Sequence, residues 1–247
     1  MMVGLGAIGP IRTAANMEPS GVASLSVLHD LNRRGIDLLA QTARRKPEHS
    51  LSLISALKRE LFASTPASRD RAAGRPFLLV DLDFRNASWW QAIAHDPGRR
   101  IRKLGDQPAF PREVALPITR ATLIAAWRTV CADARSAHVL FGLDQTVIEI
   151  LSTLPVTAID AIAEHVHPHL RPRWAEHPAY WRALLRAANG ADDAKLARID
   201  MQGIQLLTGD ILIAKNPPNA RPHARDRSRR QSARLSATPD VTAEDNA

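Results

Sequence analysis

The chain has 247 residues, of which 45% are apolar and 4% aromatic, so it can bury a core built mainly from alanine and leucine. These two residues favour helices over strands, and a net charge of +8 favours a polyanionic partner, nucleic acid before membrane. A single cysteine, Cys131, excludes an internal disulfide and a multi-cysteine zinc site, and its apolar helical surroundings predict a small core residue.

Residues 1–23 are predicted to form a flexible leader. The glycines Gly4, Gly6 and Gly9 match the spacing of a dinucleotide-binding fingerprint. That fingerprint needs a strand before it and a helix after it, whereas only three residues precede Gly4 and Pro10 follows the match. The sequence therefore predicts no nucleotide site here, and no cofactor elsewhere.

Residues 24–96 form the first predicted region, with helices over 24–46 and 51–62 and an extended segment from Pro76 to Phe84. Asn86 or Ser88 is expected to cap a short following helix. Asp81 and Asp83 alternate with apolar residues and share one face of that segment. They could form a carboxylate pair for acid–base or metal chemistry, but no third ligand or phosphate loop accompanies them, which favours a solvated face.

Residues 97–117 are rich in proline, glycine and charge and are predicted to be a linker. The second region, 118–212, begins with one long helix over 119–143, which Gly142 ends. Asp144 is expected to cap the next helix, and Ser152 or Thr153 the third. Helix, short turn and helix follow one another as in a helix-turn-helix, although spacing alone favours an ordinary helical hairpin.

The segment 213–247 has almost no large apolar residues and is predicted to be a disordered basic tail. Such a tail can bind phosphates without sequence preference, or can simply aid solubility. The candidate DNA-binding residues are Arg221, Arg225, Arg227, Arg229, Arg230 and Arg234.

Two further clusters have alternative interpretations. Four histidines within a short stretch could hold zinc with neighbouring glutamates, but prolines make the stretch irregular and surface histidines are favoured. Tryptophans could stack on bases, but core or interface positions are favoured because they lie in or beside amphipathic helices. These residues are His165, His167, His169 and His177, and the candidate partner-interface residues Trp127, Trp174 and Trp181.

The two regions share an order of features that indicates a diverged tandem duplication. In the alignment that the sequence suggests, Phe84 corresponds to Trp174, Trp90 to Trp181 with one residue of length difference, and Ile93 to Leu184.

The repeated sequence motifs resemble those of one known family. In the second region they are Leu123 to Arg128, Phe141-Gly142-Leu143 and 151–154, and in the first they are Asp30-Leu31-Asn32 and 38–41. These phrases resemble the FlhD-type bacterial transcriptional regulators, the D subunit of the flagellar master activator. The resemblance implies a helical protein that assembles with itself and with a C-type partner, which carries cysteine-ligated zinc and much of the DNA contact.

We therefore expect an all-α, mainly helical protein with short extended segments and a helix-turn-helix-like centre in its second half. The expected function is that of a DNA-associated transcriptional regulator acting as a multimer, with an FlhC-type subunit as a partner. The alternative is a helical adaptor that binds no DNA. An enzyme is not expected, because no nucleophile–base set or phosphate loop can be assembled. No apolar run reaches the roughly 18 residues of a membrane span, and no signal peptide is visible, which predicts a cytoplasmic location.

Overall fold

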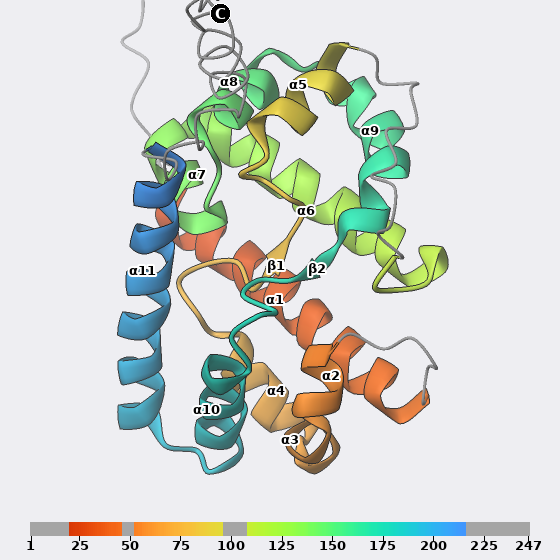
Figure 1. Cartoon of the computed structure of the whole chain (residues 1–247). Coiled ribbons are helices and arrows are strands. Elements are labelled where there is room, and N and C mark those ends of the chain that lie inside the picture. Colours follow the sequence, from red (N-terminus) through yellow and green to blue (C-terminus); the bar gives the residue numbers. More distant parts are fainter. Residues whose placement is uncertain (1–19, 46–51, 96–107, 216–247) are drawn as a thin grey trace, which may run out of the picture.

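The computed structural model describes residues 20–45, 52–95 and 108–215. The leader as far as residue 19, most of the predicted linker and the tail from residue 216 lie outside the described residues. Within the described ranges the chain is all-α, as the sequence predicts, with two very short strands (Figure 1).

The described part of the first region supplies five helices and one strand. In chain order these are α1 (Ser20–Arg45), α2 (Ser52–Ala56), α3 (Lys58–Ala63), α4 (Pro66–Ala73), β1 (Val80–Asp81) and α5 (Ala87–His95). The helix predicted over 24–46 is α1, and the helix predicted over 51–62 is divided into α2 and α3 at Leu57. Asn86 caps α5, because its side-chain oxygen accepts a hydrogen bond from the Trp89 amide at 3.2 Å.

The second region supplies the remaining elements. In chain order these are α6 (Arg112–Ala132), α7 (Ala134–Phe141), α8 (Gln145–Thr153), η1 (Val156–Ala158), α9 (Ile159–Val166), η2 (His167–His169), β2 (Arg171–Pro172), α10 (Pro178–Asn189) and α11 (Asp193–Lys215). Since α6 begins at Arg112, the last residues of the predicted linker are helical. The first residues of the predicted tail are helical as well, because α11 extends to Lys215.

The single long helix predicted over 119–143 is divided in two. Asp133 adopts an extended backbone between α6 and α7, and its side chain accepts a hydrogen bond from the Arg135 amide, so it caps α7. The predictions for Gly142 and Asp144 are confirmed: Gly142 ends α7 in the left-handed conformation, and Asp144 caps α8 through the Thr146 amide.

Two local predictions are wrong. Ser152 and Thr153 do not cap the third helix, because their hydroxyls donate back to carbonyl oxygens of α8 itself. Cys131 is exposed rather than a core residue. It follows the buried Val130 in α6, and one residue turns a helix by about 100°, which carries Cys131 off the inward face.

One helix of each region packs on helices of the other region. Helix α5 lies against α8, and α10 lies against α3 and α4. The colours of Figure 1 show this exchange directly, because the yellow α5 sits among green helices and the teal α10 among orange ones. Helices α1 and α6 cross between the two groups, and one hydrophobic cluster contains residues of both regions. The two regions are therefore interleaved around a shared core.

The interleaving follows an internal two-fold relation. Strands β1 and β2 pair antiparallel, with Val80 opposite Pro172 and Asp81 opposite Arg171. This pairing is unchanged by a two-fold rotation that places Val80 on Arg171 and Asp81 on Pro172. Val80 in the first region is then equivalent to Arg171 in the second. The same difference in residue number separates the first residue of α5 from the first residue of α10. It also separates Trp90 from Trp181 and Ile93 from Leu184, which are all buried.

The offset also relates two unusual backbone positions. Asp83 and Trp174 both have positive φ, at 58° and 53°, and each carbonyl accepts a hydrogen bond of 2.9 Å from the amide three residues later. Trp174 is therefore equivalent to Asp83. The alignment of Trp174 with Phe84, with its one-residue length difference, is wrong, because the repeat keeps a constant offset through this turn.

One buried side chain organises the segment before β1. Asn32, in α1, is fully buried; its amide donates to the carbonyl oxygens of Ala73 and Phe77, and its oxygen accepts from the Leu79 amide. These three bonds satisfy backbone groups of a non-helical stretch that would otherwise lie unpaired in the core. The segment before β1 also contacts the second region, because the Leu78 amide donates a hydrogen bond to the Leu140 carbonyl oxygen.

In the described part of the chain, no single helix is long and apolar enough to cross a membrane. One pair of consecutive helical segments, Gln145–Thr153 and Val156–His169, has the combined length and composition of a membrane span but is bent between the two segments.

Candidate interaction site

The predicted helix-turn-helix centre corresponds to α8, the short η1 turn and α9. The α8 helix and the helical stretch Val156–His169 meet at 108°, within the range of about 90–120° that is typical of a helix-turn-helix. One face of each helix is buried in the core, through residues such as Ile148 and Ile162. The geometry expected from the sequence is therefore present.

The charges on this centre do not suit a helix laid against phosphates. Neither α8 nor α9 contains an arginine or lysine, and the exposed side of α9 carries Asp160 and Glu164. Both carboxylates are held by α6: Arg120 binds Asp160 at 2.8 Å, and Arg112 binds Glu164 at 2.8 Å, which lowers the pKa of Glu164. Both are exposed ion pairs between α6 and α9, so the carboxylates on this surface are already matched by arginines of the same chain.

The carboxylates of Asp81 and Asp83 serve the junction between the regions. The guanidinium of Arg171, in β2, lies 2.7 Å from Asp83 and 3.6 Å from Asp81. The solvated face that the sequence favours is not observed, because the side chains of Asp81 and Asp83 are only 23% and 14% exposed and both bind an arginine from the paired strand. This contact pairs both carboxylates with a cation of the second region.

The four histidines do not gather around a common point. His165 and His167 bond to backbone carbonyls of their own helical turns, His169 packs on the Trp89 ring at 4.3 Å between centroids, and His177 lies beside α10. Among the described residues, no group of histidine, cysteine, aspartate or glutamate side chains could hold a metal ion.

Two of the three candidate interface tryptophans are inside the chain. Trp181 is 1% exposed and its indole nitrogen donates to the Arg173 carbonyl at 2.8 Å, while Trp174 is 5% exposed and packs on Phe77. Neither offers a surface to another chain; Trp181 instead lies at the junction of the two regions. Trp127 is half-buried and donates to the Leu154 carbonyl.

The six candidate arginines of the tail lie outside the described residues. Their role in DNA binding stays a prediction from the sequence.

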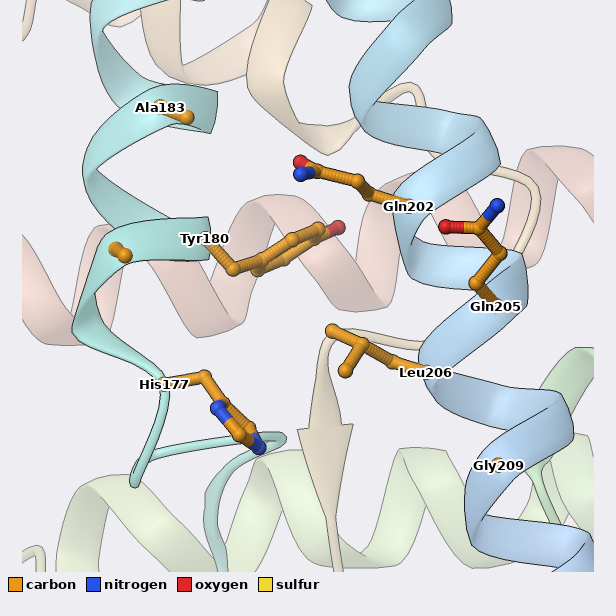
Figure 2. A pocket seen from close by; sticks show the side chains of 8 residues that line it. His177, Tyr180, Ala183, Gln202, Gln205, Leu206 and Gly209 are labelled. Atoms are coloured by element: carbon orange, nitrogen blue, oxygen red, sulfur yellow. The ribbon is translucent and has the colours of Figure 1, made fainter.

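A hollow lies between α10 and α11, and the sequence did not indicate it. It encloses about 560 Å³, and Figure 2 shows Tyr180 on α10 extending toward Gln202 on α11, with Gln205 and Leu206 further along α11 and His177 at the start of α10. The signal that could have revealed it is the repetition of small residues one helical turn apart on α10, at Ala179, Ala183 and Ala187.

A buried polar group sits at the base of this hollow. Tyr180 is 6% exposed, and its hydroxyl has no hydrogen-bond partner among the described residues. Burial raises the pKa of Tyr180, so the hydroxyl stays protonated and available as a donor. Near it, Arg75 binds Asp200 at 2.7 Å, and burial of that pair raises the pKa of Asp200.

A close approach at Gly203 sets the position of α11. A Cβ atom there would lie 2.0 Å from the tip of the Phe77 ring, whereas a Cβ at Gly209 on the same helix meets nothing within 4 Å. We expect Gly203→Ala to lower the free energy of unfolding by about 1–3 kcal/mol, because a buried ring must move. Chemical denaturation followed by circular dichroism measures the change.

Gly209→Ala is the matched control. Alanine favours a helix over glycine by about 0.5–1 kcal/mol, so this variant should be at least as stable as the parent chain. Equal stability of the two variants would contradict the close packing of α11 on Phe77.

Comparisons with known proteins identify no relative. Neither family models, nor curated protein sequences, nor solved structures give a match to the chain.

Proposed function

We propose that the chain is a non-enzymatic helical subunit of a DNA-associated transcriptional regulator of the FlhD type, which acts as a multimer and together with a C-type partner. The observation that carries the proposal is the internal two-fold relation, in which α5 and α10 are exchanged between the regions. An arrangement of two related copies is what the duplicated FlhD-like phrases imply. The interleaved body would supply assembly surfaces rather than base readout.

The charge distribution supports an indirect contact with DNA. The α8–α9 centre lacks basic side chains, and its exposed carboxylates are paired with Arg112 and Arg120. A groove-reading helix needs donors and positive charge facing the duplex. We therefore assign phosphate contact to the arginines of the segment 221–234, and sequence recognition to the partner.

Deleting residues 216–247 is expected to weaken DNA binding without changing its specificity. Each phosphate contact contributes about −0.9 to the slope of log affinity against log salt on duplex DNA, so loss of several arginine contacts should flatten the slope by several units. Fluorescence anisotropy on specific and random duplexes, over a salt titration and with any partner present, measures this slope.

A full-length variant with all six tail arginines replaced by glutamine is the matched control, because it keeps the length of the segment. It should reproduce the flattened slope. An unchanged slope in both proteins, or loss of specific binding alone, would contradict an electrostatic anchor. Tight sequence-specific binding by the purified chain without the segment would contradict the indirect contact.

The second candidate function is that of a protein adaptor without DNA. The open hollow beside α10 and α11 favours it, because such a surface suits a protein segment. A complex purified from the native host that protects no DNA in footprinting would support the adaptor over the regulator.

A further inference from the structure

The hollow of Figure 2 continues into a second one along the same pair of helices. The second hollow encloses about 520 Å³, lies toward the end of α10, and shares Ala183 with the first. On α10 the lining includes small residues one turn apart, Ala179, Ala183 and Ala187, beside the larger Tyr180 and Arg186, and Gly190 follows the helix. The opposite side of α10 is covered by α3 and α4. The α10–α11 pair thus has one covered side and one open groove along its length.

The two ends of this groove differ in charge. Arg186, Lys195 and Arg198 line the second hollow together with one carboxylate, Asp192. Lys195 binds Asp192 at 2.7 Å and Arg186 binds the buried Glu60 at 2.8 Å, whereas Arg198 has no ion pair among the described residues. Among the described residues, no lysine, arginine or carboxylate lines the first hollow. Arg198 therefore leaves one uncompensated positive charge at this end of the groove, and the other end is lined by His177 and uncharged side chains.

The neutral end has an unused hydrogen-bond donor. The Tyr180 hydroxyl is buried and protonated, has no hydrogen-bond partner in the part of the chain that the structure describes, and extends from α10 toward α11. A buried donor without an acceptor destabilises the chain, and an acceptor on a bound molecule reaches this hydroxyl when the side chains that cover it move aside. Exposed Gln202 and Gln205 add further donors and acceptors nearby.

We propose that this groove binds an amphipathic helix of another protein that carries acidic residues at one end. A third helix laid on a helical pair is a common mode of recognition, and the small residues of α10 leave room for its apolar side. Helix α10 has 12 residues, a length of about 18 Å at 1.5 Å per residue, which matches about three turns of a partner. Its carboxylates would lie over Arg186, Lys195 and Arg198.

Charge complementarity selects this occupant over two others. A second copy of the chain would bring its own basic groove end and no row of carboxylates among the described residues of α10 and α11. The segment 221–234 of the same chain is itself basic and would be repelled by the basic end. The inference goes beyond the proposed function, because it holds for a regulator and for an adaptor.

The test uses the full chain and a fluorescein-labelled helical peptide of about 18 residues. The peptide has alanine and leucine on one face and three glutamates at one end; a matched peptide has lysines in their place. Fluorescence anisotropy should show binding of the glutamate peptide, at least about tenfold tighter than the lysine peptide. Ala183→Arg, which fills the groove, should abolish binding, and Tyr180→Phe should weaken it about fivefold.

Arg198→Glu tests the charge without filling the groove. At this exposed position the substitution should reduce or reverse the preference for the glutamate peptide, while Arg128→Glu, on α6, should leave it unchanged. Absence of binding to the intact chain, or binding unaffected by both Ala183→Arg and Arg198→Glu, would overturn the proposal. A dimer of the chain that Ala183→Arg dissociates in sedimentation would also overturn it, since a second copy would then fill the groove. None of these measurements involves DNA, so their outcome is separate from that of the salt titration.

Discussion

Asn32→Ala is expected to lower the free energy of unfolding by about 3–5 kcal/mol. The truncated side chain would leave the carbonyl oxygens of Ala73 and Phe77 and the amide of Leu79 without partners in a buried segment. Each unpaired buried group costs about 1–3 kcal/mol. Urea denaturation followed by far-ultraviolet circular dichroism measures the loss.

Gln41→Ala, at an exposed position of the same helix, is the control and should change stability by less than about 0.5 kcal/mol. A loss below about 1 kcal/mol for Asn32→Ala would show that water replaces the side chain, and that Asn32 does not organise the segment before β1.

Asn32→Asp tests the same site by pH. The new carboxyl would face two carbonyl oxygens in the core, which disfavours its charged form and raises its pKa in the folded chain above about 3.9, the value in an unfolded chain. The native state then holds the proton more tightly than the unfolded state. The variant should be closest to the parent in stability below about pH 4 and lose stability as the pH rises through the folded-state pKa.

Trp181→Ala is expected to lower the free energy of unfolding by about 3–5 kcal/mol, and Trp90→Ala by a similar amount. Both side chains are almost fully buried, at 1% and 0% exposure, and both indole nitrogens donate to a backbone carbonyl in the turn before their helix. The two sites are equivalent under the internal two-fold relation. Because α5 packs on α8 and α10 packs on α3 and α4, each substitution should weaken both regions together.

Trp127→Ala is the comparison, because Trp127 is half-buried and also donates an indole hydrogen bond. Its cost should be clearly smaller than that of the two core tryptophans. Circular dichroism is the suitable signal, since each variant removes a fluorophore. If Trp90→Ala produced a first transition confined to part of the helical signal, the regions would be unfolding separately and the exchange of α5 and α10 would be contradicted.

Local features could be predicted from the sequence because their causes are local. Asn86, Gly142 and Asp144 each act on backbone groups within a few residues, and a cap or a left-handed turn is fixed by that short segment. Alternation in the sequence singled out Asp81 and Asp83, but the strand ends at Asp81 and Asp83 has positive φ, so it is Arg171 that brings the two carboxylates together. Their partner, Arg171, lies in a strand far along the chain, and no local pattern names it.

Errors arose where several local patterns are compatible with the same residues. Ser152 and Thr153 can cap a following helix or bond back to their own, and Leu154 ends α8 in an extended conformation before Pro155, so the hydroxyls bond back. The division at Asp133 is similar, because an aspartate followed by a serine three residues later suits both a helix interior and a new cap. These choices depend on the angle at which the next helix packs.

The exchange of α5 and α10 was beyond prediction, because it depends on which of two similar surfaces each helix covers. Trp90 and Trp181 were identifiable as a repeated pair, but each could pack on its own region or on the other. The groove was missed for a related reason: Ala179, Ala183 and Ala187 would be equally compatible with a covered helix face.

The most direct test of the interleaved body is native-state hydrogen exchange of the full chain, resolved by peptide. We expect the core of α5 around Trp90 and the core of α10 around Trp181 to open with the same free energy as the cores of α1 and α6, because the regions share one core. Protection of α1, α4 and α5 that differs by several kcal/mol from that of α6, α8 and α10 would show two independent domains and contradict the account.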